Sequence, residues 1–449
     1  MKHTMVRQRH LLLGLAVFSL LFHTARAAGP ERWPQFRGGC SGIVDGAQLP
    51  TAWGATTNVV WKTAIPGKSW SSPIVWGDKV FVTSAVTGQT VEPPRKGLYV
   101  WRVWGTREAD EYRCMIYCLD FATGKVLWEH VAYHGAAPGA IHMKNSYASE
   151  TPATDGERIY ACFGNVGLFC CDMDGREVWS QKWGFSPTRL GWGPAASPVL
   201  HGDRVYMVND NEQSSFLAAF DKRTGRQLWR VERDEPSNWA TPFIWENELR
   251  TEIVTPGRKK VRSYDLDGRL LWEFSGMSDI VIPTPVASRS LLYVSSGYVS
   301  NSLRPVYAIR PGATGDISLK DDQTSNPFIA WCDRKGGPYV TSPLLYGDRL
   351  YVLYDKGFLA CYDAKTGKPV YGRQRLSATA TAFTASPWAC DGIIYCLSED
   401  GETFVVQAGP EFKLLARHSL DQMTLATPAI ARDNLFIRTF SDLWRIQGR

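Results

Sequence analysis

Short apolar runs separated by tight polar turns recur along the whole chain. The segments 71–82 and 116–128 form one such unit, and 341–352 and 359–371 form a later one. Each run alternates in polarity, as a half-buried strand does, and most runs border a Gly-Asp or Thr-Gly turn. A unit opens with a short polar residue followed by Pro, and it closes near an Asp, a Gly turn and a Trp. The pattern predicts four short strands per unit.

The prolines that open the units set the length of the repeat. They are Pro73, Pro152, Pro198, Pro242, Pro285, Pro343, Pro387 and Pro428. Their spacings of 79, 46, 44, 43, 58, 44 and 41 residues indicate a unit near 44 residues, with insertions in the first and fifth. Four-stranded units of this size are typical of propeller blades. We therefore expect an all-β, eight-bladed β-propeller, with seven blades as the alternative.

The two ends of the repeat region predict how the ring closes. The last unit, 426–446, has material for three strands, and 58–62 reads as a fourth strand with no unit before it. Pairing the two removes a sheet edge. The expected organisation is a signal peptide over residues 1–27, an extension over residues 28–57 and a propeller over residues 58–449.

A tryptophan recurs at the end of the unit. A large flat side chain at one fixed place per blade is expected to fill the gap between neighbouring sheets, where it buries much apolar area. This structural docking role falls to Trp61, Trp128, Trp179, Trp229, Trp272 and Trp331, with Tyr371 replacing the tryptophan in the sixth unit.

Composition and charge exclude two classes of protein. With 44% hydrophobic residues, the chain is too apolar to be disordered. The net charge of +6 includes four basic residues within residues 1–27, which contain no acid. Without them 46 basic residues face 44 acidic ones. A nearly neutral protein offers no electrostatic case for binding nucleic acid.

Residues 1–27 have the pattern of a secretory signal peptide. A basic start precedes the apolar residues 11–22, and Ala25-Arg26-Ala27 fits a cleavage site. Twelve apolar residues are too few to span a bilayer. We expect an exported protein, periplasmic or secreted, that is monomeric and has no transmembrane segment in its mature chain; an uncleaved anchor is the alternative.

Three turns carry a specific motif. Segments 120–128 and 221–229 contain Asp, Thr-Gly, a basic residue and Trp at fixed spacing, and 363–368 repeats all but the Trp. The motif resembles the tryptophan-docking repeat of the pyrroloquinoline-quinone (PQQ)-type β-propellers, and the resemblance spans about residues 58–446. That superfamily holds two classes. One comprises quinoprotein dehydrogenases, which hold PQQ and calcium in a central funnel, and the other comprises non-enzymatic binding platforms, such as the lipoprotein subunit of the outer-membrane β-barrel assembly machinery.

Strand order predicts where a ligand or partner would bind. If the first strand of each blade runs from the top face to the bottom, the loops leading into the blades and the loops between second and third strands share the top face. These loops vary most, as functional loops do. The candidate top-face binding residues are Asn145, Tyr147, Glu150, Trp192, Asn209, Asp210, Trp239 and Asp279. The alternative is that these polar residues simply face water.

The first insertion, 83–112, is expected to hang over the top face. It carries Tyr99, Trp101, Trp104, Arg95, Arg102 and Arg107, with Arg113 at its flank. Exposed aromatic and arginine side chains are typical of recognition surfaces. They would equally serve to cap the funnel.

The sequence lacks a complete set of catalytic residues. The resemblance implies a catalytic Asp, Glu and Asn ligands for calcium, and in several members adjacent cysteines over the cofactor. Cys170 and Cys171 are adjacent but lie in a predicted strand, where alternation places one thiol on each face. His130 and His134 are assigned to a loop, so a helical zinc site is not expected.

These observations favour an exported, non-catalytic scaffold that binds a protein partner or small polar ligand at the funnel. Neither a metal nor a cofactor is expected. The alternative is a PQQ- and calcium-dependent dehydrogenase that oxidises an alcohol or sugar. A third hypothesis is a carbohydrate-binding lectin that uses Trp101 and Trp104.

Overall fold

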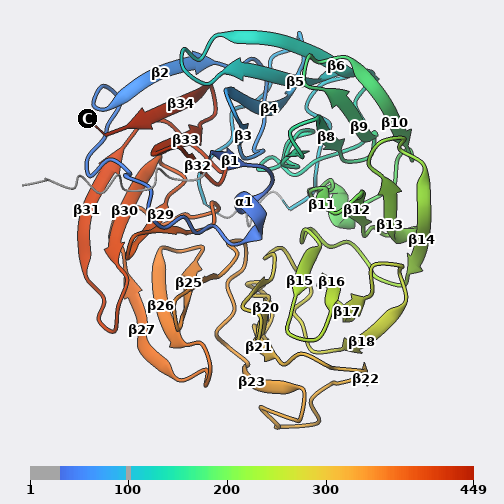
Figure 1. Ribbon diagram of the computed structural model, residues 1–449, viewed down its shortest axis with the longest axis vertical. Coiled ribbons are helices and arrows are strands. Elements are labelled where there is room, and N and C mark those ends of the chain that lie inside the picture. The colour runs from blue at the N-terminus through green and yellow to red at the C-terminus, as the bar shows by residue number, and fades with distance from the viewer. Residues whose placement is uncertain (1–30, 98–102, 449) are drawn as a thin grey trace, which may run out of the picture.

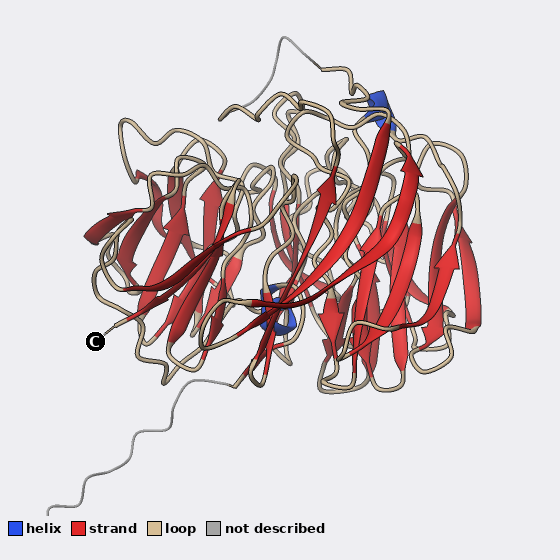
Figure 2. Cartoon of the chain, turned by 90° about the horizontal axis from the view of Figure 1, so that it is seen from above, coloured by secondary structure: helices blue, strands red, loops and turns tan. Residues whose placement is uncertain are grey.

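The computed structural model describes residues 31–97 and 103–448. Eight sheets surround a central axis, and within each sheet the strands follow one another outward from that axis (Figure 1). Seen from the side, the strands run between two faces that carry the loops (Figure 2). The eight-bladed expectation is confirmed, and the seven-bladed alternative is wrong.

Each blade is an antiparallel sheet of consecutive strands. Blade 1 has β3 (Ile74–Trp76), β4 (Lys79–Val86), β5 (Glu111–Asp120) and β6 (Val126–Ala136); blade 2 has β7 (Ala153–Thr154), β8 (Arg158–Phe163), β9 (Gly167–Asp172) and β10 (Glu177–Lys182). Blade 3 has β11 (Val199–His201), β12 (Arg204–Asn209), β13 (Ser215–Asp221) and β14 (Gln227–Arg233); blade 4 has β15 (Phe243–Glu246), β16 (Thr251–Thr255), β17 (Val261–Tyr264) and β18 (Leu270–Phe274). Blade 5 has β19 (Val286–Ala287), β20 (Leu292–Ser295), β21 (Val306–Ile309) and β23 (Ile329–Asp333); blade 6 has β24 (Leu344–Tyr346), β25 (Arg349–Tyr354), β26 (Phe358–Asp363) and β27 (Pro369–Arg375). Blade 7 has β28 (Trp388–Cys390), β29 (Ile393–Leu397), β30 (Glu402–Gln407) and β31 (Leu414–Ser419).

Blade 8 combines the two ends of the propeller. It contains β32 (Ala429–Ala431), β33 (Asn434–Arg438), β34 (Asp442–Gln447) and, outermost, β2 (Val59–Ala64). β2 pairs antiparallel with β34, with Lys62 opposite Trp444 and Ala64 opposite Asp442. This pairing closes the ring, as the sequence predicted, and leaves no broken blade at the junction.

Two short strands extend the blades. β1 (Arg32–Trp33) pairs with β3 on the axis side of blade 1. β22 (Gly315–Asp316) comes from the insertion in blade 5 but pairs in parallel with β18, the outer strand of blade 4. The second insertion therefore covers the neighbouring blade. The described helices are one turn each, α1 (Arg37–Cys40) and the 3-10 helix η1 (Arg189–Gly191).

Five of the six docking tryptophans contact the turn of the following blade. Their indole Nε1 groups donate to backbone carbonyl oxygens at 2.9–3.1 Å: Trp61 to Phe121, Trp128 to Met173, Trp179 to Lys222, Trp229 to Leu266 and Trp331 to Ala364. A Cβ at Gly367, where φ is +70°, would lie 2.4 Å from the Trp331 ring. Glycine is therefore required there both by the backbone conformation and by the close approach of the ring.

The sixth docking tryptophan, Trp272, makes a different contact from the other five. Its Nε1 donates to Oε2 of Glu252 at 2.7 Å, within its own blade, and neither side chain is exposed. The outer strand that carries Trp272 is covered by β22. The docking tryptophan of blade 4 thus makes its hydrogen bond within its own blade.

The Asp-x-x-Thr-Gly turns are held by the aspartate. In the turn of blade 6, Oδ1 of Asp363 accepts hydrogen bonds from the backbone N–H and the hydroxyl of Thr366 at 2.8 and 2.6 Å. These bonds lower the pKa of Asp363 below its usual value. The motif is therefore explained by turn geometry.

The cysteines of the described structure are packed thiols. Cys170 packs with Val205 and Phe216 toward blade 3, whereas Cys171 packs with Phe81 and Phe169 on the side of blade 1. Both are free and buried, and the predicted alternation across the strand is confirmed. The loop predicted around His130 and His134 is wrong, because both lie in β6, whose hairpin with β5 extends to Ala136.

No helix among the described residues is long and apolar enough to cross a membrane. The predicted signal peptide, residues 1–27, lies outside the described residues.

Candidate functional site

A ring of hydroxyl groups lines the central channel. They belong to the residue before the opening proline of each blade: Ser72, Thr151, Ser197, Thr241, Thr284, Ser342, Ser386 and Thr427. Backbone N–H groups of six of these residues donate to the hydroxyl oxygen of the next blade, at 2.9–3.1 Å. The short polar residue that opens each unit is therefore a link between blades. In the described structure these oxygens act as acceptors, so their O–H groups can donate to a ligand.

The N-terminal extension covers the bottom end of the channel. Arg37 in α1 is fully buried, and its Nη2 donates to the carbonyl oxygen of Pro387 in blade 7 at 3.2 Å. The carbonyl oxygen of Pro34 accepts the N–H of Thr154 in blade 2 at 2.8 Å. α1 accordingly lies in the middle of the ring (Figure 1), and Phe36 lines the channel.

Aromatic side chains form one wall of the channel. Trp192 and Trp239 have ring centroids 5.6 Å apart, and Tyr298 and Tyr339 have centroids 5.4 Å apart. We call these four residues the aromatic wall. Trp70 also lines the channel, and its Nε1 is buried without a hydrogen-bond partner among the described residues. The channel has a volume of about 450 Å³, within the range of about 300–1,000 Å³ for small-molecule pockets.

The channel is electrically neutral near pH 7. Lys144 is the one Lys, Arg, Asp or Glu among the described residues that line it, and its ammonium pairs with Glu399, which is also hydrogen-bonded to Thr384. Burial, with smaller effects from Lys144 and Lys68, lowers the pKa of His142 to about 4. The imidazole is therefore uncharged.

A second cavity, of about 380 Å³, adjoins this channel beside blades 6 and 7. It shares Lys144, Val340 and Thr384 with the channel wall. Asp355 and Glu399 line it, and Oδ2 of Asp355 is buried without a partner in the described part of the chain. Desolvation raises the pKa of Asp355. This polar chamber therefore offers a hydrogen-bond acceptor next to an uncharged channel.

The first insertion contacts the top-face loops around the channel. The N–H of Gly97 donates to Oε2 of Glu399 in blade 7 at 2.8 Å, and the N–H of Gly105 donates to the carbonyl oxygen of Leu190 at 2.8 Å. Trp192 donates from Nε1 to the carbonyl oxygen of Val103. The described parts of the insertion thus contact blade 7 on one side and the loop before blade 3 on the other. The side chain of Trp104 is 67% exposed, whereas Tyr99, Trp101 and Arg102 lie outside the described residues.

The candidate top-face residues separate into two groups. Asn145, Trp192 and Trp239 line the channel. Tyr147, Glu150, Asn209 and Asp210 are buried away from it, and Asp279 forms an ion pair with Arg258 at 3.1 Å. Within the first group Asn145 has a positioning role, because its amide donates to the carbonyl oxygens of Trp192 and Pro194 at 2.8 and 3.1 Å.

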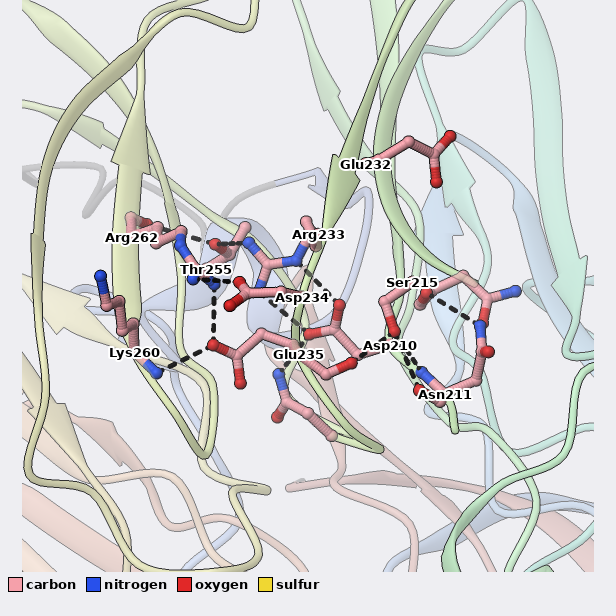
Figure 3. A network of polar contacts seen from close by, with 12 residues as sticks. Asp210, Asn211, Ser215, Glu232, Arg233, Asp234, Glu235, Thr255, Lys260 and Arg262 are labelled. Carbon is pink, nitrogen blue, oxygen red and sulfur yellow. Dashed lines mark hydrogen bonds and ion pairs between the residues drawn. The ribbon is translucent and has the colours of Figure 1, made fainter. Parts of the chain in front are cut away.

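Asp210 belongs to a network that joins blades 3 and 4 (Figure 3). It accepts two hydrogen bonds from Arg233 and one from Nδ2 of Asn238 at 2.9 Å. Arg233 also donates to Oγ1 of Thr255 at 2.6 Å. The Asp210 carboxylate is therefore engaged inside the protein.

Glu150 is buried without a charged partner. Its side chain lies beside Cys162 and Gly164 between small cavities, and its Oε2 has no partner in the described structure. Desolvation raises its pKa to about 8, so the carboxyl group is largely protonated near neutral pH.

Sequence reasoning did not select several residues that define the site. Trp70, Tyr298 and Tyr339 belong to loops of different blades and share no motif. The hydroxyl ring did leave a signal, because a Ser or Thr precedes Pro at the start of every unit. That signal marked the repeat, and only the closed ring shows that it also lines the channel.

The channel does not fit PQQ and calcium. PQQ carries three carboxylates, and the described channel wall offers them one ammonium, which is already paired with Glu399. Calcium needs six to eight oxygen ligands, usually including carboxylates, and no Asp or Glu is among the described residues that line the channel. No cluster of three or more His, Cys, Asp or Glu suited to a metal occurs in the described ranges.

The fold resembles that of several known proteins. The family model described as outer membrane protein assembly factor BamB matches residues 163–304. BamB from Moraxella catarrhalis is 12% identical with a TM-score of 0.56, over 86% of this chain and 99% of that one. A search of curated protein sequences finds no match.

Two dehydrogenases have similar structures. A europium-containing methanol dehydrogenase is 11% identical with a TM-score of 0.58, over 92% of this chain and 90% of that one. Quinohemoprotein alcohol dehydrogenase from Comamonas testosteroni is 11% identical with a TM-score of 0.58, and the match covers 95% of this chain and 82% of that one. The resemblance to the PQQ-like β-propellers is thus confirmed. Because both functional classes share this fold, function must be argued from the site.

Proposed function

We propose that the protein is an exported, non-catalytic binding protein that takes a small uncharged ligand into the central channel from the top face. The observation that carries this proposal is the composition of the channel wall. It combines an aromatic wall with a ring of hydroxyl groups, and its one charged group is paired with Glu399. Apolar and aromatic surface with a few polar groups is typical of small-molecule sites. Export rests on the signal peptide predicted in residues 1–27.

The alternative is a PQQ- and calcium-dependent dehydrogenase that oxidises an alcohol or sugar. The fold shared with two dehydrogenases supports it. The residues of the channel wall argue against a dehydrogenase. A tricarboxylate and a divalent cation would both lose their hydration beside described residues that offer no matching charges. We therefore favour binding over oxidation.

A second candidate function is capture of a protein partner on the top face. Two aromatic side chains there are exposed, Trp104 by 67% and Phe185 by 60%. Exposed aromatic residues are enriched in protein interfaces. The match to a family described as an outer membrane protein assembly factor supports the same idea.

Ligand-observed NMR with a panel of small ring compounds, neutral and charged, tests the proposal. Ser300 lies exposed at the channel wall, so Ser300→Trp should obstruct the channel while leaving the blades intact. We expect at least one compound to bind and Ser300→Trp, but not Ser300→Ala, to weaken it at least about tenfold. The proposal fails if no compound binds, if Ser300→Trp has no effect, or if PQQ and calcium support dye reduction with an alcohol panel.

A further inference from the structure

We propose that the ligand is a neutral saccharide whose ring stacks on the aromatic wall and whose hydroxyl groups reach Asp355 in the adjoining chamber. This inference rests on the proposed function, since it names the class of molecule that the channel takes. It is carried by three features of the described residues: the aromatic wall, two buried polar atoms without partners, and the junction of the two cavities.

The aromatic wall favours a ring with apolar faces. Trp192, Trp239, Tyr298 and Tyr339 come from blades 3, 4, 5 and 6 and pack as one cluster on the channel side. The negative face of an aromatic ring attracts the weakly positive C–H face of a sugar, and the apolar contact adds to this attraction. The hydroxyl ring meets the polar edge of the same molecule with O–H donors.

Two orphaned atoms indicate what the ligand must offer. Nε1 of Trp70 is a donor without an acceptor, and Oδ2 of Asp355 is an acceptor without a donor, within the described ranges. Trp70 as a whole is only 7% exposed. A buried polar atom without a partner destabilises the protein, so a ligand that supplies one is favoured. A hydroxyl group both donates and accepts, and a saccharide therefore satisfies both atoms with one kind of group.

Among the described residues, the channel wall offers an ionic ligand no free charge, whereas the chamber is lined by side chains of both signs: Asp355, Glu399, Lys356 and Arg375. Lys144 is engaged by Glu399, and Arg375 in the second chamber lies over the Phe358 ring with 4.1 Å between its Cζ and the centroid. An anion or cation in the channel would lose its hydration without gaining a free counter-ion from the described channel wall. A neutral polyol loses less hydration free energy on entering the channel than an ion does.

The junction of the cavities predicts the size of the ligand. The channel of about 450 Å³ and the chamber of about 380 Å³ meet at Lys144, Val340 and Thr384. One sugar ring on the aromatic wall leaves the chamber for a second ring. We therefore expect a disaccharide, or the end of a longer glycan, to bind better than a monosaccharide.

Isothermal titration calorimetry tests this inference with glucose, cellobiose and maltose, and with glucuronic acid and glucosamine as charged probes. We expect a neutral disaccharide to bind more tightly than glucose and than either charged sugar. Asp355→Asn and Tyr298→Leu should each weaken that disaccharide about tenfold, the effect of one hydrogen bond to a charged group or of one stacking ring. The matched control is Asp203→Asn, because Asp203 is an 81% exposed carboxylate on the bottom face.

Saturation-transfer NMR on the unaltered protein keeps the test independent of variant folding. The protons on the C–H faces of one sugar ring should receive the most saturation. If no saccharide binds, while other ring compounds bind and Ser300→Trp blocks them, this inference is wrong and the proposed function stands. If nothing binds, both fail. The inference is also overturned if a saccharide binds but neither Asp355→Asn nor Tyr298→Leu weakens its binding.

Discussion

Arg233 and Asp210 form a bidentate ion pair in which neither side chain is exposed (Figure 3). Nε and Nη2 of Arg233 lie 2.8 and 3.0 Å from Oδ1 and Oδ2 of Asp210. Arg233 continues to the hydroxyl of Tyr264 in blade 4 at 3.0 Å. The pair therefore fixes the junction of blades 3 and 4 beneath the top face, close to the loop that carries Trp239.

Asp210→Asn should destabilise the protein by about 3–5 kcal/mol, because it leaves the Arg233 guanidinium buried without its counter-charge. Urea unfolding measures the change. Glu232→Gln is the matched control, since the Arg230–Glu232 pair has side-chain exposures of 30% and 66% and should contribute less than about 1 kcal/mol. Equal effects of the two substitutions would contradict the prediction.

Trp272→Phe should cost more stability than Trp331→Phe. The indole of Trp272 donates to the buried carboxylate of Glu252 at 2.7 Å, whereas that of Trp331 donates to a neutral carbonyl oxygen at 2.9 Å. Hydrogen bonds to charged groups contribute about 1.5–3 kcal/mol and neutral ones about 0.5–1.5 kcal/mol. Chemical denaturation of both variants gives the comparison, and an equal or larger loss for Trp331→Phe would contradict a hydrogen bond from Trp272 to a charged carboxylate.

Glu150→Gln should flatten the dependence of stability on pH. The folded pKa of Glu150 is raised from 4.5 to about 8, so the native state holds a proton that the unfolded state releases. The contribution is fully present below about pH 4.5 and is lost as pH rises toward about 8, by up to about 1.4 kcal/mol per pH unit.

Unfolding free energies measured between pH 5 and 8 check this prediction. The wild-type value should fall with pH more steeply than that of Glu150→Gln. Glu157→Gln, at an exposed position in the turn between β7 and β8, should leave the wild-type slope unchanged. Parallel curves for wild type and Glu150→Gln would count against a protonated Glu150.

Gly38→Ala should loosen the extension that covers the bottom of the channel. Gly38 has a φ of +68°, and a Cβ there would lie 2.7 Å from the Trp33 ring. Gly77→Ala is the matched control, because its φ is +55° but its Cβ would meet nothing within 4 Å. Both variants carry backbone strain of about 1–2 kcal/mol, and Gly38→Ala adds the clash.

Limited proteolysis followed by mass spectrometry distinguishes these two variants. Cleavage within residues 31–57 should accelerate at least about tenfold in Gly38→Ala, since local opening controls access of the protease. Gly77→Ala should be cleaved there at the wild-type rate. The role of the extension as a cover would be disproved by equal rates in all three proteins.

The propeller could be predicted because its information is local and repeated. Each unit carries its own opening Pro and turn residues, such as Asp363 and Thr366. Because the pattern recurs, a wrong strand assignment in one unit does not change the predicted fold. The closing strand was also predictable, since residues 58–62 and the incomplete last unit each lack a partner that the other supplies. The contact of Trp272 was not predictable, because its partner Glu252 lies on another strand of the same blade and outside the repeated turn motif.

The candidate site was only partly predictable. The sequence assigned all the candidate residues to top-face loops, yet Tyr147, Glu150 and Asp210 are buried away from the channel, whereas Asn145 and Trp239 line it. Neighbouring positions in irregular loops have no fixed period, so their directions cannot be read from spacing.

The sequence by itself determined the length of the repeat, the strand order within a blade and the closure of the ring, and it favoured eight blades, since hydrophobic alternation and turn chemistry act over a few residues. Only the tertiary structure decided that eight hydroxyl groups form one ring, that Arg37 and Phe36 cover its lower end, and that Trp70 and Asp355 line two adjoining cavities. These features depend on distances between residues of different blades, which packing around the axis sets and local sequence does not.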